Sequence, residues 1–126
     1  MKFLLLLHQD QRLWEDTSPA ARTQLLREHD VFSRAVAEQG TILAGEALST
    51  VSAATTFRRR GQTTQITEGP ATEGAGGTAG EDPAGAEQLG GFYLLDVPDL
   101  DVVLELVGLL PEYSIEIRPV IDVDGS

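Results

Sequence analysis

The sequence predicts an α+β fold in which two helices lie on one face of a largely antiparallel sheet. Two segments repeat apolar residues at the three- and four-residue spacing of an amphipathic helix. Several shorter segments are either continuous apolar runs or alternate apolar with polar residues, as strands do. The chain has 126 residues, which is the length of one domain. We therefore expect a single domain over residues 1–126.

The chain is expected to begin with a strand and a helix. Residues 3–7 are a continuous apolar run, which is typical of a strand in the middle of a sheet. A helix is predicted over residues 18–39, because Ser18 can cap its first turn and Pro19 fits its first position without losing a hydrogen bond. Gly40 should end this helix as a left-handed cap.

Further strands and a long loop are expected after this helix. Residues 41–47, 53–59 and 63–67 are predicted strands, and a tight turn at 60–62 joins the last two into a hairpin at the edge of the sheet. The stretch at about 71–88 is rich in glycine and alanine and has no large apolar side chain. We expect a loop insertion there, because such a stretch buries too little surface to offset its ordering entropy.

The second half repeats the order strand, helix and strand. Residues 92–97 form the predicted strand, Pro98 and Asp99 open a helix that Pro111 closes, and residues 114–120 alternate as a final strand. This order of elements is that of a ferredoxin-like sandwich. No helix is expected on the other face of the sheet, and apolar residues on both sides of the central strands favour a homodimer that covers it.

Composition excludes several classes of partner. The formal net charge is −11, with 20 acidic and 9 basic residues, and nucleic acids are not expected as partners because they need a clustered excess of Lys and Arg. The chain has no cysteine, and two histidines are too few for a multi-histidine centre, so no metal site is expected. The N-terminal apolar run is too short for a signal peptide or a membrane span, so we expect a cytoplasmic protein with no membrane partner.

His29 is the first candidate for a functional residue. It lies four residues after Leu25 and three before Phe32, within the apolar stripe of the predicted helix. A polar ring that faces a core must be hydrogen-bonded there, or it must face a cavity in which it acts. The alternatives are therefore a structural histidine with satisfied hydrogen bonds and a site residue in a small-molecule pocket.

Two acids are candidate partners of this histidine. Glu46 interrupts an apolar strand and follows Gly45, which would let another group approach the backbone closely. A carboxylate next to His29 would hold one imidazole tautomer and raise its basicity, as a general base requires. Glu68 could supply a second acid. The competing interpretation makes Glu46 a strand-end carboxylate in water and Glu68 an exposed turn residue.

Four further residues are candidates for ligand binding: His8, Asp10, Phe32 and Tyr93. His8 and Asp10 come at the end of the first strand, where sites are often built, or they are simply the first solvated residues after a buried strand. Tyr93 could orient a ligand through its hydroxyl, or it could serve in aromatic packing.

Blocks of sequence along nearly the whole chain occur in an order found in a known family. They are residues 2–7 with Trp14, then 45–48, 54–58, 67–70, 88–93, 96–101 and 116–120. Together these blocks resemble the YCII-related proteins of the DGPF group. Glu68-Gly69-Pro70-Ala71 stands where that group has Asp-Gly-Pro-Phe, so the acid and the turn are kept and the aromatic residue is not.

The resemblance implies a ferredoxin-like subunit that pairs into a dimeric α+β barrel, with a small pocket between helix and sheet. It also implies that a histidine of the first helix, in a His-x-x-aromatic setting, forms the proposed catalytic pair with a nearby acid. His29 and Phe32 match that setting.

Two functions fit these observations. One is an enzyme without a cofactor, in which His29 moves a proton and Glu46 or Glu68 orients it, in an elimination or an isomerisation. The other is a non-catalytic, regulatory module that senses an unknown small molecule in the same pocket.

Overall fold

The computed structural model describes residues 1–10, 16–71 and 87–123. Most of the predicted loop insertion at 71–88 lies outside these residues. The described elements, in chain order, are β1 (Lys2–Gln9), α2 (Pro19–Gln39), β2 (Thr41–Ala47), the 3-10 turn η1 (Val51–Ala53), β3 (Thr55–Arg60), β4 (Thr63–Glu68), β5 (Gln88–Asp96), α3 (Leu100–Val107) and β6 (Ser114–Pro119).

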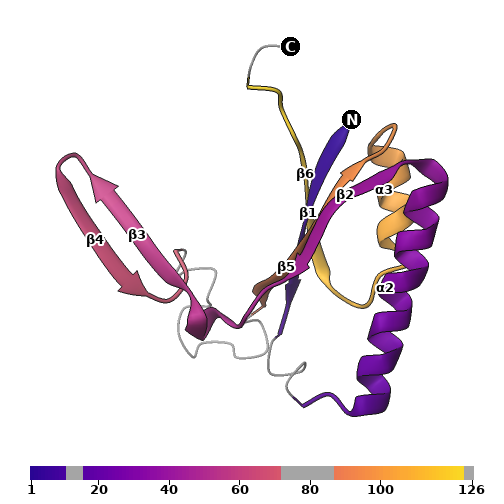
Figure 1. Ribbon diagram of the computed structural model, residues 1–126, viewed down its shortest axis with the longest axis horizontal. Helices are drawn as coiled ribbons and strands as arrows, with labels where there is room; N and C mark the ends of the chain where they lie inside the picture. The colour runs from indigo at the N-terminus through magenta and orange to yellow at the C-terminus, as the bar shows by residue number, and fades with distance from the viewer. Residues whose placement is uncertain (11–15, 72–86, 124–126) are drawn as a thin grey trace.

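The main sheet has four strands in the order β2-β5-β1-β6, and every neighbouring pair is antiparallel. The connection through α2 passes from β1 over β5 to β2, and the connection through α3 passes from β5 over β1 to β6. Both helices lie on the same side of the sheet (Figure 1). This is the predicted α+β, ferredoxin-like fold, and β1 holds the predicted central position.

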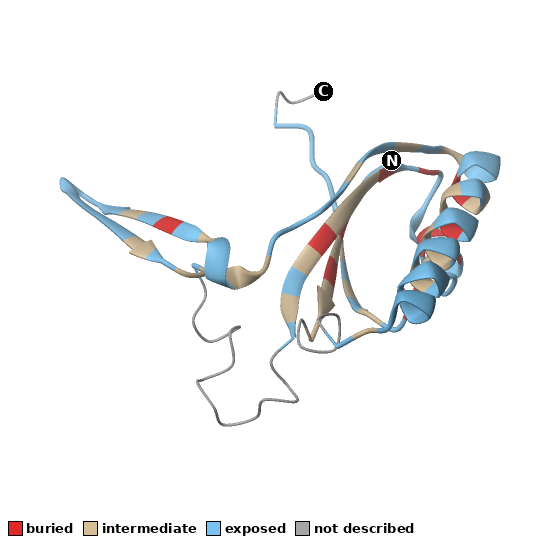
Figure 2. Cartoon of the chain, turned by 60° about the horizontal axis from the view of Figure 1, so that its bottom comes forward, coloured by how far each residue is buried: buried red, intermediate tan, exposed pale blue. Residues whose placement is uncertain are grey.

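The core lies between the sheet and the two helices. Alternate residues of β1 point toward the helices, and Phe3, Leu5 and Leu7 are buried there. Phe32 and Val36 of α2 pack against them. Figure 2 shows the buried residues on the strands of the main sheet and on the helices. Full burial of one such side chain stabilises the fold by about 1.5–3 kcal/mol.

Of the two signals predicted to set the ends of α2, the one at Ser18 is confirmed and the one at Gly40 is wrong. The Ser18 hydroxyl accepts a hydrogen bond from the backbone N–H of Ala21 at 3.2 Å, as the capping pattern predicted. Gly40 is not a left-handed cap, because its φ of 176° is extended backbone. Glycine is needed there for space, since a Cβ atom would lie 2.1 Å from the carbonyl oxygen of Asp96.

The hairpin of β3 and β4 was predicted at the edge of the main sheet, and this is wrong. The two strands form a separate two-stranded sheet, which extends away from the main sheet (Figure 1). Phe57 and Ile66 are cross-strand partners with 60% and 69% of their surfaces exposed. The hairpin therefore presents a pair of large apolar side chains that the described chain leaves in solvent.

The face of the main sheet that points away from the helices is also apolar at its centre. Leu4 pairs with Leu94, and Leu6 pairs with Phe92, so the register puts all four side chains on this face. Each is only half-buried. No helix within residues 1–10, 16–71 and 87–123 has the length and apolar character to cross a membrane.

Candidate functional site

His29 lies on the side of α2 that faces the sheet, and both of its ring nitrogens meet tyrosine hydroxyls. The distance from Nδ1 to Oη of Tyr93 is 2.6 Å, and the distance from Nε2 to Oη of Tyr113 is 2.9 Å. Tyr93 comes from β5, and Tyr113 from the connection between α3 and β6. The tautomer of the imidazole decides which tyrosine donates a hydrogen bond to it and which one accepts.

A glycine in β2 makes room for Tyr93 beside His29. Gly45 is the cross-strand partner of Tyr93, and a Cβ atom on Gly45 would lie 2.6 Å from Cδ1 of the tyrosine ring. The predicted close approach at Gly45 is thus confirmed. On its other side the ring of Tyr93 packs against Phe32, with 4.9 Å between ring centroids. These contacts fix the orientation of the hydroxyl that meets His29.

Burial keeps the three rings of this cluster uncharged near neutral pH. Removal from water lowers the pKa of His29 below its ordinary value, and the negative charge of Glu28 opposes that shift. Burial also raises the pKa of Tyr93. The pKa of Tyr113 is raised by burial, by the neighbouring Tyr93 and by the charge of Glu28. The cluster is therefore a neutral imidazole between two protonated phenols.

A cavity of about 290 Å³ opens beside His29, between the first half of α2 and the edge of the sheet. Three small residues on the helix-facing side of β2 and β5, Gly45, Ala47 and Gly91, leave this space unfilled. The described residues that line the cavity are Leu7, Leu26, His29, Gly45, Glu46, Ala47, Gly91, Phe92 and Tyr93. Its walls are largely apolar, with His29, Glu46 and Tyr93 as the polar residues among these, and this is the usual make-up of a small-molecule site.

Glu46 lines the same cavity as His29, but the hydrogen-bond partners of the histidine are Tyr93 and Tyr113. The cross-strand partner of Glu46 is Phe92, the neighbour of Tyr93, so the side chain of Glu46 points to the face of the sheet away from α2. Simple alternation from Ile42 would have put Glu46 on the helix side. A bulge between Ile42 and Ala44 reverses that alternation, and the sequence gives no sign of it.

Glu68 also lies apart from the described cavity. It is exposed at the end of β4, where it pairs with Thr55 in the separate two-stranded sheet. The expected contact between His29 and either acid is therefore not formed within the described chain.

Two residues near His29 were missed by sequence reasoning. Tyr113 lies 84 residues away along the chain, and no local pattern marks it. Glu28 precedes His29 directly, and its charge raises the pKa of the histidine. Adjacency to a candidate base was the one signal that could have identified Glu28. The charge of Glu28 also raises the pKa of Tyr113, whose hydroxyl meets Nε2 of His29. We therefore infer that Glu28 acts mainly at the Nε2 end of the imidazole.

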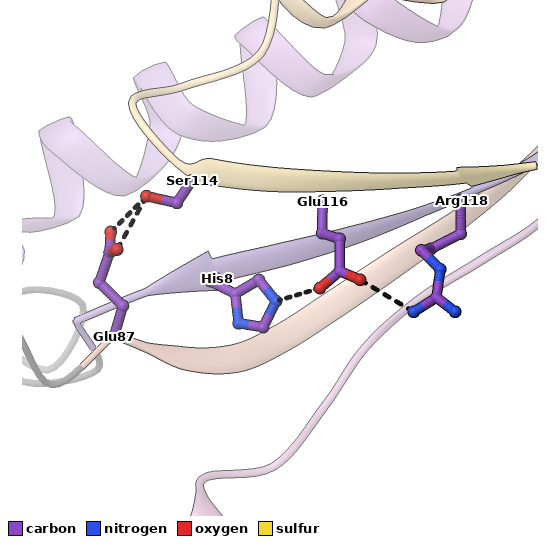
Figure 3. A network of polar contacts seen from close by, with 5 residues as sticks. All are labelled: His8, Glu87, Ser114, Glu116 and Arg118. Carbon is purple, nitrogen blue, oxygen red and sulfur yellow. Dashed lines mark hydrogen bonds and ion pairs between the residues drawn. The ribbon is translucent and has the colours of Figure 1, made fainter. Parts of the chain in front are cut away.

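His8 lies on the opposite face of the sheet from His29. Its Nε2 atom is 3.9 Å from Oε1 of Glu116, whose Oε2 accepts a hydrogen bond from Nη1 of Arg118 at 3.0 Å. Figure 3 shows these three side chains in a row, directed away from the helix. Nearby, the Ser114 hydroxyl donates a hydrogen bond to the carboxylate of Glu87, with 2.8 Å between Oγ and Oε1.

The remaining predicted site residues, Phe32 and Asp10, lie in the core and just after β1, respectively. Phe32 is fully buried beneath Tyr93 and supports its ring. Asp10 is half-buried just after β1 and is not among the described residues that line the cavity. In residues 1–10, 16–71 and 87–123, no group of three or more His, Cys, Asp or Glu side chains is arranged to hold a metal ion.

Comparison with known proteins agrees with the blocks of sequence quoted above. A search of curated proteins found no match to this chain. A model of the YCII-related domain family matches residues 1–124. The match spans nearly the whole chain, from β1 to beyond β6, so this chain belongs to the YCII-related family.

Proposed function

We propose that this protein binds a small molecule in the cavity beside His29 and acts on it as an enzyme without a cofactor. His29 is the base of the proposed reaction, which transfers a proton as in an elimination or an isomerisation. The observation that carries the proposal is a half-buried histidine on the wall of a cavity, with both ring nitrogens in hydrogen bonds to tyrosines.

A neutral imidazole is the form of histidine that can take up a proton. Burial lowers the pKa of His29, so the ring is ready to act as a base at neutral pH. Tyr93 lines the same cavity and is the proposed contact to the ligand, and Phe32 holds the tyrosine ring in place. The proposed mechanism assigns no proton transfer to Glu46, which lines the cavity with its side chain turned from the helix, or to Glu68, which lies in the separate two-stranded sheet.

The proposed working form is a homodimer. Leu4, Leu6, Phe92 and Leu94 make an apolar centre on the face of the sheet that the helices leave open. Apolar patches rimmed by polar groups are typical of protein interfaces. A second copy packed on this face would cover these side chains and complete a dimeric α+β barrel.

Proton transfer can be tested without knowledge of the natural substrate. Enolisable ketones are incubated with the protein in D₂O, and exchange of their acidic C–H protons is followed by NMR. We expect exchange with the wild type and its loss in His29→Gln. His8→Gln is the matched control, because it removes the chain's other histidine on the opposite face of the sheet. Equal exchange in wild type and His29→Gln would contradict the proposal.

The second candidate function is a non-catalytic module that senses a small molecule. It is favoured by the same hydrogen bonds, because a histidine with both nitrogens occupied also fits a purely binding role. The two functions differ in one outcome. A sensing module would bind a ligand that is recovered unchanged and without deuterium, and His29→Gln would weaken binding only.

A further inference from the structure

We propose that the cavity beside His29 takes an uncharged ligand that donates a hydrogen bond from a hydroxyl group, a phenol or an enol, to Oη of Tyr93. This inference rests on the proposed function and names the chemical class of its ligand.

The lining of the cavity favours an uncharged ligand. No lysine or arginine occurs among its nine described lining residues. The ionisable acid among these lining residues, Glu46, and Glu28, whose charge acts on His29, are both negative when ionised. A carboxylate or phosphate ligand would lose its hydration without gaining a cation, which is costly in an apolar site. The leucine, glycine and alanine walls instead match an apolar ring or chain.

The hydrogen bonds around His29 form a chain with a direction. A neutral imidazole has one N–H, so one tyrosine donates to it and the other accepts. In the first arrangement Tyr93 donates its O–H to Nδ1 and Nε2–H donates to Tyr113. In the second arrangement both hydrogen bonds are reversed.

The two distances select the first arrangement, because an O–H group makes shorter hydrogen bonds than an N–H group. The 2.6 Å between Tyr93 and Nδ1 fits an O–H donor, and the 2.9 Å between Nε2 and Tyr113 fits an N–H donor. The charge of Glu28 favours the same arrangement. It acts on His29 and Tyr113, at the Nε2 end of the cluster. A negative charge there favours protons that point toward it, from Tyr93 to Nδ1 and from Nε2 to Tyr113. The O–H of Tyr93 is then used within the protein, and its oxygen can only accept a hydrogen bond from the cavity. The ligand must therefore supply the donor.

This arrangement also gives the proton a route. The ligand's O–H bond breaks and its proton goes to Oη of Tyr93, while the original hydroxyl proton of Tyr93 goes to Nδ1 of His29. The products are a ligand oxyanion and an imidazolium, and the new O–H of Tyr93 donates to that oxyanion. Tyr113 keeps accepting from Nε2–H throughout, so it is a positioning residue. Tyr93 is the residue that touches the ligand.

The probes for this proposal are p-cresol, its isomer anisole and benzoate. Anisole has the same atoms as p-cresol but no O–H, and benzoate carries a negative charge. Binding is measured by NMR titration of the full chain. We expect p-cresol to bind about tenfold more tightly than anisole, which corresponds to one hydrogen bond, and benzoate to bind more weakly than either.

Two tyrosine variants assign the preference to one hydroxyl. Tyr93→Phe should bind p-cresol and anisole equally. Tyr113→Phe should keep the preference for p-cresol, because Tyr113 is not among the described residues that line the cavity. Nitrogen-15 NMR should show the Nε2–H tautomer of His29 in the wild type. The proposal is overturned by equal binding of p-cresol and anisole to the wild type, by no binding of p-cresol at its solubility limit, or by the Nδ1–H tautomer.

The result is separable from the test of the proposed enzyme. A preference for p-cresol with no deuterium exchange in any ketone would support the ligand class and overturn only the catalytic function. Deuterium exchange that depends on His29, together with equal binding of p-cresol and anisole, would support the catalytic function and overturn only the ligand class.

Discussion

The substitution Gly45→Ala tests whether the missing side chain at this position holds the His29 cluster together. The added Cβ atom would lie 2.6 Å from Cδ1 and 2.9 Å from Cε1 of Tyr93, whereas ordinary contact begins at 3.4 Å. The tyrosine ring must therefore withdraw by about 0.8 Å. It is packed on Phe32 from the other side, so the movement also disturbs the hydrogen bond from Tyr93 to His29.

The expected loss of stability follows from these contacts. Overpacking a well-packed position costs about 1–3 kcal/mol, and a lost hydrogen bond costs about 1 kcal/mol. Replacing glycine in a strand regains about 0.5–1 kcal/mol, because the unfolded chain loses freedom. We expect Gly45→Ala to lower the free energy of unfolding by about 1–3 kcal/mol.

Urea unfolding followed by circular dichroism measures this loss, and NMR of the His29 ring reports on the site. Gly108→Ala is the matched control. It makes the same substitution where the new Cβ atom would meet only the carbonyl oxygen of Glu105, at 3.5 Å. This control should be neutral or slightly stabilising. A Gly45→Ala protein with unchanged stability and an unchanged His29 signal would refute the reasoning.

Three further predictions concern pH, assembly and capping. Because the pKa of His29 is lower in the folded protein than its unfolded value of about 6.5, stability should be lost as pH falls below 6.5. Urea unfolding of His29→Gln should show a flatter dependence there, and equal slopes would count against it. Leu6→Glu should convert the proposed dimer to a folded monomer in sedimentation analysis, while Gln24→Glu on the exposed side of α2 should not. An unchanged mass in Leu6→Glu would refute the proposed interface. Asp99→Ala should cost about 1 kcal/mol, because its carboxylate accepts from Val102 N–H at the start of α3, and an unaltered urea midpoint would argue against this cap.

Parts of the fold that depend on neighbouring residues could be predicted from the sequence. The serine before Pro19 and the acid at Asp99 both cap helices as expected, because a cap needs only its own first turn. The apolar run of β1 correctly marked the central strand. The position of the hairpin could not be predicted in this way. Whether two strands join a larger sheet depends on contacts with distant residues. Neither the apolar and polar pattern of the hairpin nor its charges specify those contacts.

The candidate site was predictable to the same extent. A polar ring in an apolar helical stripe correctly marked His29 as half-buried with its hydrogen bonds formed. Carboxylates were expected as its partners, whereas the hydrogen-bond partners in the described chain are two tyrosines. One bulge in β2 turned Glu46 to the other face, and the hydroxyl of Tyr113 arrived from a distant connection. The face of the sheet that a side chain occupies, and the distant residues that it contacts, are fixed only when the whole sheet assembles. A local sequence pattern therefore does not predict them.

A pH titration of His29 by NMR, in the wild type, Tyr93→Phe and Tyr113→Phe, tests most directly whether His29 is a neutral base held by two tyrosines. His29 should titrate below pH 6.5 in the wild type and at a changed pH in each variant. A His29 midpoint at or above 6.5 that neither substitution moves would contradict the proposed site.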